Sequence, residues 1–187
     1  TDPEPELGDR QVYWPRGKAL GGSSAINGMI YIRGVPMDFA AWEQAGAKGW
    51  SWEDVLPYYK KAERQQVHDD DLHGADGPLH VQEVRDKRPM DDVFLNAMNE
   101  AGIPSNADFN GVDQTGCGYY QFTQNNGRRW STASAYLTPA RSRSNLTILT
   151  HAHTQRVLFE GKRACGVEIS RRGNRQGING AHVILSG

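Results

Sequence analysis

The stretch WPRGKALGGSSAINGMIYIRG, residues 14–34, contains the residue types best suited to hold a ligand. Gly21 and Gly22 lack a Cβ, so the backbone there can adopt unusual dihedral angles and approach a planar or anionic ligand closely. Ser23 and the Asn27 amide offer hydrogen-bonding groups beside them. Taken alone, these residues predict either a ligand-binding loop or a glycine-rich turn that leads into a core strand.

Two common phosphate-binding motifs do not fit the chain. A Walker A loop needs G-x-x-x-x-G-K-[ST], but Ala19 follows the Gly-Lys pair and Val12 occupies the first glycine position. The Rossmann fingerprint G-x-G-x-x-G is approached only at residues 116–121, which lack the third glycine. A self-contained dinucleotide site is therefore not expected.

Other reactive side chains lack the partners that their chemistry needs. His68 and His73 flank three aspartates, and His151 and His153 could share one face of a strand. A metal site needs three or four converging ligands, so no metal site is expected from these patterns. Ser24 lacks the G-x-S-x-G elbow, which leaves a serine hydrolase as an alternative with little support.

Composition excludes several classes of function. The 187 residues contain 37% hydrophobic residues, enough for one domain, and the balance of Lys+Arg 21 against Asp+Glu 22 disfavours nucleic-acid binding. No signal peptide is visible, and no apolar run reaches the ~18 residues of a transmembrane segment. Cys117 and Cys165 lie far apart, so free thiols and a cytoplasmic location are expected. Composition does not indicate an oligomeric state.

The elements that must position the glycine-rich stretch form a mixed α/β (α+β) chain. Residues 25–34 fit either a strand or a buried helix. Helices are predicted over 37–46, 52–64 (capped by Ser51), 89–102 and 132–142, and strands over 78–84, 119–126, 145–152, 154–160, 163–172 and 181–187. The chain starts at Thr1 without a methionine and ends on the apolar run HVILSG, so it is expected to be an internal piece of a longer protein.

The order of several segments resembles one enzyme family. GKALGGSSAINGMIYIRG and DFAAWEQAGAKGWSWEDVLPYYKKAE are followed by DGPLHV, DFNGVDQTGCGYYQFTQNNGRRWSTASAYLTPA, NLTILTHAHTQRVLFEGKRACGVEI and HVILSG. Together they resemble the glucose–methanol–choline (GMC) oxidoreductases, particularly the choline-dehydrogenase-like members. The resemblance covers essentially all 187 residues, and its signature G-K-x-L-G-G-S-S-x-I-N, with an aromatic residue at Tyr31, is long and therefore specific.

The resemblance implies part of a FAD-binding fold that oxidises small-molecule alcohols by hydride transfer to flavin N5. Residues 1–35 would contact FAD, residues 36–145 would form mostly the substrate or cap region, and residues 146–187 would return to the FAD-binding domain. The alcohol (choline, another primary alcohol or an aryl alcohol) and the electron acceptor (oxygen or a quinone-type carrier) stay open. The cofactor-binding residues implied are Gly21, Gly22, Ser23, Asn27, Gly28, Met29, Ile30 and Thr154.

Thr154 stands where the family usually has a valine that touches the cofactor through its main chain. The family's Rossmann loop and catalytic histidine have no counterpart in the chain, so no catalytic residue is assigned within it. The chain alone is expected to be inactive and to bind FAD weakly or not at all. The alternative is a non-catalytic binding or structural module derived from the same fold.

Overall fold

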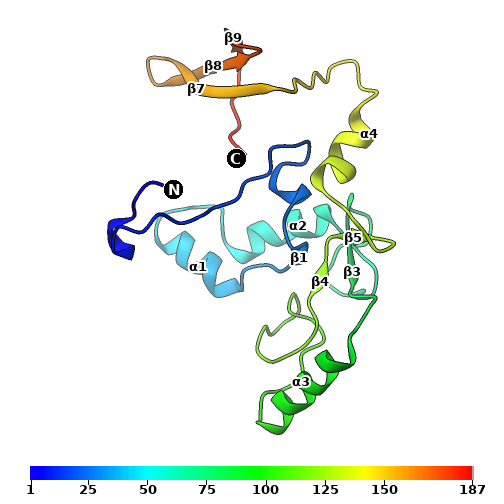
Figure 1. Ribbon diagram of the computed structural model, residues 1–187. Coiled ribbons are helices and arrows are strands. Elements are labelled where there is room, and N and C mark those ends of the chain that lie inside the picture. The colour runs from blue at the N-terminus through cyan, green and yellow to red at the C-terminus, as the bar shows by residue number, and fades with distance from the viewer. Residues whose placement is uncertain (187) are drawn as a thin grey trace. The chain divides into compact units, whose positions relative to one another are not determined.

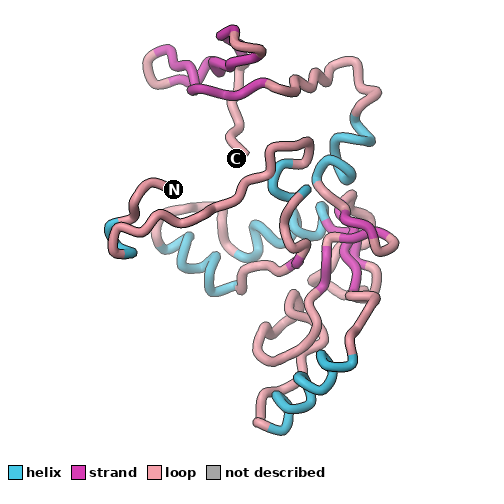
Figure 2. The backbone as a smooth tube through the Cα atoms, viewed as in Figure 1, coloured by secondary structure: helices cyan, strands magenta, loops and turns pink. Residues whose placement is uncertain are grey.

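The computed structural model describes residues 1–186, and the chain divides into two compact units, Thr1–Pro139 and Ala140–Gly187 (Figure 1). The first unit contains the glycine-rich stretch. Residues 11–18 form an extended loop that leads to it, and loops account for much of this unit (Figure 2).

A four-stranded sheet organises the first unit. Its strand order is β1-β4-β3-β2, in which β2 and β3 are parallel and the other pairs are antiparallel. A separate hairpin, β5-β6, follows β4 closely along the chain. The strands are β1 (Ile30–Tyr31), β2 (Glu63–Gln65), β3 (Leu79–Glu83), β4 (Gln121–Phe122), β5 (Gln124–Asn125) and β6 (Arg128–Arg129). The short β1 shows that the stretch 25–34 is a turn followed by a strand, not a buried helix.

Three helices of the first unit begin where local signals predict. They are α1 (Pro36–Gln44), α2 (Trp52–Ala62) and α3 (Pro89–Glu100). A proline in the first turn starts α1 and α3, where its missing N–H costs no helical hydrogen bond. At the start of α2 the Asp54 amide donates to Ser51 Oγ at 3.2 Å, which confirms the predicted cap. The helix α2 continues through Pro57.

The predicted helix at 132–142 is shorter and wider than an ordinary α-helix. A π-helical segment, η3 (Ala133–Leu137), leads into the short α4 (Thr138–Ala140). Ser131 Oγ accepts a hydrogen bond from the Ser134 amide at 3.4 Å at its start. Two 3₁₀ turns, η1 (Pro5–Leu7) and η2 (Gly22–Ala25), complete the helical elements among residues 1–186.

The second unit contains an antiparallel sheet of three strands. These are β7 (Ala152–Glu160), β8 (Arg163–Arg171) and β9 (Asn174–Asn179), in the order β7-β8-β9. The strands predicted at 154–160 and 163–172 are confirmed. The strand predicted at 145–152 is wrong, because β7 begins only at Ala152.

The strand predicted at 181–187 is also wrong over 181–186; residue 187 lies outside the described residues. The polar segment β9 takes its place beside β8. Arg172 and Gly173, with φ of 51° and 80°, form a tight turn that returns the chain directly along β8. The turn therefore makes β9 the partner of β8.

The buried residues of the first unit include charged groups as well as apolar ones. Phe39, Val81 and Ala135 are buried, and so are Arg33 and Glu63. No helix within residues 1–186 is long and apolar enough to cross a membrane.

Candidate functional site

The Gly-Gly-Ser-Ser sequence forms a tight turn whose shape requires glycine. Gly21 and Gly22 both lie in the left-handed region, with φ of 92° and 53°. They start η2, after which the amides of Ile26 and Asn27 both donate to the Ser23 carbonyl oxygen, at 3.1 and 2.9 Å. We call residues 21–30 the glycine turn.

The inner side of the glycine turn is fixed by hydrogen bonds to a segment about 110 residues away. The Thr132 amide donates to Ser24 Oγ at 3.0 Å, and Thr132 Oγ1 donates to the Gly21 carbonyl oxygen at 3.2 Å. A Cβ on Gly21 would lie 3.2 Å from Ser131 Oγ, which is closer than an ordinary contact, and the φ of 92° also favours glycine at this position. Two distant parts of the chain thus hold the turn in one conformation.

The outer side of the glycine turn is open. A Cβ added at Gly22 or Gly28 would meet no atom of residues 1–186 within 4 Å. Ser23, Asn27 and Gly28, which precede β1, are exposed. This side therefore offers bare backbone and short polar side chains to a ligand.

Met29 connects the glycine turn to β1 in a conformation that is uncommon for a residue with a side chain. Its φ is 64°, in the left-handed region. The Met29 amide donates to Asn27 Oδ1 at 3.1 Å, and its carbonyl oxygen accepts from the Thr123 amide at 2.8 Å. Left-handed non-glycine residues cluster at ligand sites, where the surrounding structure must hold them in place. After Met29, Ile30 begins β1 with its side chain half exposed.

A buried ion pair lies directly after β1. The Arg33 guanidinium pairs with the Glu63 carboxylate, and both side chains are almost completely buried. Burial raises the pKa of Glu63, although Gly74 and Arg33 both donate hydrogen bonds to its carboxylate. Burial, together with the Glu63 charge, also raises the pKa of Tyr31 to about 12. This pair joins the end of β1 to β2.

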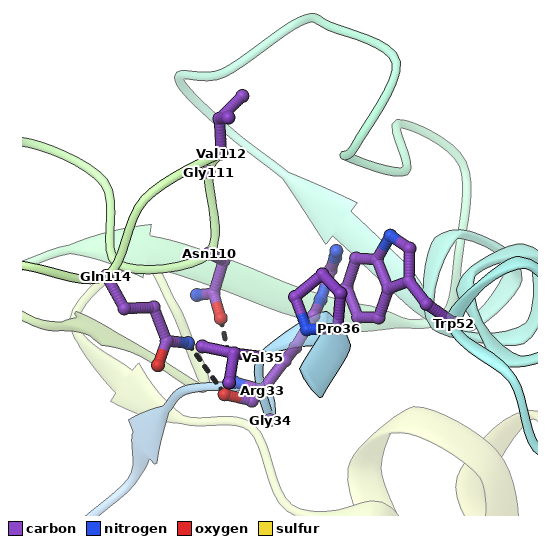
Figure 3. A pocket seen from close by; sticks show the side chains of 9 residues that line it. All are labelled: Arg33, Gly34, Val35, Pro36, Trp52, Asn110, Gly111, Val112 and Gln114. Atoms are coloured by element: carbon purple, nitrogen blue, oxygen red, sulfur yellow. Dashed lines mark hydrogen bonds between the residues drawn. The ribbon is translucent and has the colours of Figure 1, made fainter. Parts of the chain in front are cut away.

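The backbone of Arg33 is bound from another loop. Its amide donates to Asn110 Oδ1 at 2.8 Å, and its carbonyl oxygen accepts from Gln114 Nε2 at 2.7 Å (Figure 3). The hollow that these residues line with Trp52 has a volume of about 20 Å³. That space holds about one water molecule, so it is not a substrate pocket.

A larger hollow lies between α1 and α2. It has a volume of about 590 Å³ and is mostly apolar. Its lining includes Phe39, Trp42, Trp50, Tyr58 and Tyr59. It shares no lining residue with the glycine turn.

The histidine and aspartate pattern of the sequence forms a local cluster. His73 Nδ1 lies 2.8 Å from Asp70 Oδ1, and His73 Nε2 lies 3.4 Å from Asp108 Oδ2. Although slight burial opposes it, the hydrogen bond from His73 lowers the pKa of Asp70. Because the two carboxylates face opposite nitrogens of one ring, the cluster joins two loops through His73.

A model of the GMC oxidoreductase family matches residues 6–187. The chain belongs to the GMC oxidoreductase family. GMC oxidoreductases bind FAD, and the family's mixed α/β FAD-binding fold agrees with the fold class expected from the sequence.

Curated GMC relatives match the whole chain. It is 45% identical over 190 residues to an alcohol dehydrogenase [acceptor] of Pseudomonas putida, covering 100% of this chain and 34% of the relative. It is also 45% identical over 188 residues to mitochondrial choline dehydrogenase of Mus musculus, covering 100% of this chain and 32% of the relative. These relatives confirm the resemblance to choline-dehydrogenase-like members. The chain spans about a third of their length.

Two solved structures of oxidoreductases are similar in fold to this chain. Pyridoxine 4-oxidase from Mesorbium loti superposes with a TM-score of 0.87 at 32% identity, covering 97% of this chain and 36% of that one. An FAD-dependent oxidoreductase from Chaetomium thermophilum gives a TM-score of 0.86 at 26% identity, covering 96% and 34%.

The residues assigned to FAD from the GMC resemblance fall into two groups in the structure. Gly21, Gly22, Ser23, Asn27, Gly28, Met29 and Ile30 all lie in the glycine turn. Thr154 lies in the second unit, exposed on β7. β7 is an edge strand with an irregular register between Thr154 and Arg156, so main-chain groups on its outer edge are available.

Three residues of the site were not predicted from the sequence. Arg129, Ser131 and Thr132 contact the glycine turn, but the sequence indicated only that a helix begins at residue 132. The only local sign was the Asn126-Gly127 turn, which predicts the hairpin that carries Arg129 without indicating its contacts.

Proposed function

We propose that this chain forms one wall of the FAD site in an enzyme that oxidises the CH–OH group of a small alcohol. The cofactor-binding residues proposed are Gly21, Gly22, Ser23, Asn27, Gly28, Met29, Ile30 and Thr154. Membership of the GMC family and the names of the relatives support this reaction class. Choline is the substrate favoured by the relatives, and other primary or aryl alcohols are the alternatives.

The single observation that carries the proposal is the open outer side of the glycine turn. Space above Gly22 and Gly28 lets a flat ring or a pyrophosphate reach the backbone without meeting a side chain. The inner side is fixed by Thr132, so the turn would not have to become ordered on binding. The residues present therefore fit FAD.

Bound FAD supplies the acceptor for the hydride that leaves the alcohol carbon. The chain's own contribution is to bind and orient. Ser23 and Asn27 offer polar groups at the open side, and Ile30 offers an apolar side chain that excludes water. The proton of the alcohol would be taken by a base outside these residues, because no histidine in the chain matches the family's catalytic context.

The domain assignment made from the sequence belongs to the same proposal. Residues 1–35 would carry the main FAD contacts, residues 36–145 would form mostly the substrate or cap region, and residues 146–187 would return to the FAD-binding domain. A cytoplasmic location, with peripheral membrane association as the alternative, is proposed from the two free cysteines.

The test uses the product of the complete open reading frame that encodes these residues. The purified protein should show the absorption bands of an oxidised flavin, and anaerobic addition of choline should bleach them. Benzyl alcohol and ethanol serve as parallel substrates, and oxygen and a soluble quinone as parallel acceptors. A protein that stays colourless after incubation with FAD would overturn the proposal and favour a non-catalytic module.

Residues 1–187 expressed alone provide a second measurement. They are expected to be inactive and to bind FAD weakly or not at all. A stoichiometric yellow complex of these residues would show that they hold a complete FAD site.

A further inference from the structure

Arg129 reaches the glycine turn from a hairpin about 100 residues further along the chain. In the β5-β6 hairpin, Arg129 pairs with Gln124 and Arg128 with Asn125. Neighbouring residues of a strand point to opposite faces, so the two arginines have different surroundings. Arg128 is exposed, whereas Arg129 is partly buried.

Backbone hydrogen bonds fix the hairpin beside the glycine turn. The Thr123 amide donates to the Met29 carbonyl oxygen at 2.8 Å, and the Trp130 amide donates to the Thr123 carbonyl oxygen at 2.8 Å. This ladder places Arg129, the neighbour of Trp130, within reach of the turn.

The Arg129 guanidinium donates two hydrogen bonds to the glycine turn. Nη1 donates to the Ser24 carbonyl oxygen at 3.1 Å and to Asn27 Oδ1 at 2.8 Å. Asn27 Oδ1 also accepts from the Met29 amide at 3.1 Å. The carboxamide oxygen of Asn27 is thus held by two donors, one of them charged.

Two donors on the oxygen determine which way the amide of Asn27 faces. An amide that rotated by half a turn would place its NH₂ group against the Arg129 cation and the Met29 N–H, which are both donors. Within residues 1–186, Asn27 Nδ2 donates no hydrogen bond, and Asn27 is exposed. The two N–H groups are therefore available to an acceptor on the open side of the turn.

We propose that Arg129 is a positioning residue for FAD, which fixes the Asn27 amide so that its NH₂ group donates to an acceptor oxygen of the cofactor. This inference rests on the proposed function, because it assumes that FAD lies on the open side of the glycine turn. FAD has carbonyl and phosphate oxygens, which can accept hydrogen bonds from the NH₂ group in this orientation.

The test is the affinity for FAD of the complete open-reading-frame product, prepared without cofactor and titrated into FAD while its fluorescence is followed. Arg129→Met should raise the Kd by about 10-fold or more, since a charge-assisted contact is lost and the amide is freed. Arg128→Met is the matched control on the same strand and should leave the Kd unchanged. Arg129→Gln, whose side chain is shorter than that of arginine and carries no charge, replaces Arg129→Met if the latter does not fold, and its Kd should rise as well.

A double-mutant cycle separates positioning from general support of the fold. If Arg129 acts through Asn27, then Arg129→Met should change the Kd by less than about 3-fold in an Asn27→Ala background. Equal losses in both backgrounds would show that Arg129 only supports the fold, and the inference would be wrong. It would also be wrong if Arg129→Met bound FAD as Arg128→Met does. A wild-type protein that binds no FAD would instead refute the proposed function.

Discussion

Substitutions of two glycines by alanine should separate the shape of the glycine turn from its contact with FAD. Gly17 lies just before the turn, and its amide donates to Ser23 Oγ at 3.2 Å. A Cβ at position 17 would overlap the Gly22 carbonyl oxygen and lie 2.8 Å from the Ser23 amide nitrogen. A Cβ at Gly28 would meet nothing within 4 Å in the part of the chain that the structure describes.

The expected magnitudes follow from these distances. Ordinary contacts begin at 3.4 Å, so Gly17→Ala must move the Ser23 amide nitrogen by about 0.6 Å, and the overlapping Gly22 carbonyl oxygen by more than that. Overpacking of this kind lowers the free energy of unfolding by about 1–3 kcal/mol. Gly28→Ala should instead raise it by about 0.4–1 kcal/mol, since the methyl group fits and the unfolded chain loses freedom.

The two variants should both lose affinity for FAD, for different reasons. Gly17→Ala displaces the turn. Gly28→Ala leaves the turn in place but fills space assigned to the cofactor, at a cost of about 1–3 kcal/mol, or about 5- to 150-fold in Kd.

The assays are urea unfolding and FAD fluorescence titration of the complete open-reading-frame product. Gly177→Ala is the control, because its Cβ would lie 3.6 Å from the Leu158 side chain, an ordinary contact. The reasoning is refuted if Gly28→Ala binds FAD as tightly as the wild type. It is also refuted if Gly17→Ala keeps full stability.

Two further predictions concern buried and titrating groups. Arg33→Met should lower the free energy of unfolding by about 3–5 kcal/mol, because it leaves the Glu63 carboxylate buried without its cation. In urea unfolding, the double variant Arg33→Met/Glu63→Met should recover part of that loss. A double variant less stable than Arg33→Met would contradict this prediction. Burial, together with the Arg64 charge, lowers the pKa of His80, whose ring packs against Trp130. The folded state therefore resists protonation of His80, so the stability of the protein should fall as the pH drops below 6.5. Melting temperatures measured between pH 7 and 5 should fall less for His80→Gln than for the wild type. Equal pH profiles of the two proteins would contradict this prediction.

Local sequence signals were sufficient for α1, α2 and α3. Pro36 and Pro89 start α1 and α3, and Ser51 caps α2, because these residues act on the first turn of their own helix. The tight turn at Asn126 and Gly127, both with positive φ, was equally predictable.

Strands made of polar residues were not predictable. β2 contains Glu63–Gln65 and β9 contains Asn174–Asn179, and neither has an alternating apolar pattern. Their pairing depends on neighbours elsewhere in the fold: β2 joins β3 in parallel, and β9 follows the turn after β8. The apolar run at 181–186 gave the opposite error, because apolar composition alone does not supply a partner strand.

The candidate site was predictable on one side only. The glycine turn could be predicted because its residues are contiguous and its glycines permit unusual backbone dihedral angles and close approach of a ligand. The contacts of Arg129 and Thr132 with that turn join positions more than 100 residues apart, and no local pattern encodes them. The residues that hold the turn therefore had to come from the structure.

Hydrogen exchange of the complete open-reading-frame product, with and without FAD, tests the central claim most directly. Peptides that cover the glycine turn should exchange more slowly when FAD is bound, and their protection should exceed that of peptides from α3. Equal exchange of the glycine-turn peptides in the two states, in a protein that binds FAD, would contradict the claim that this turn forms a wall of the cofactor site.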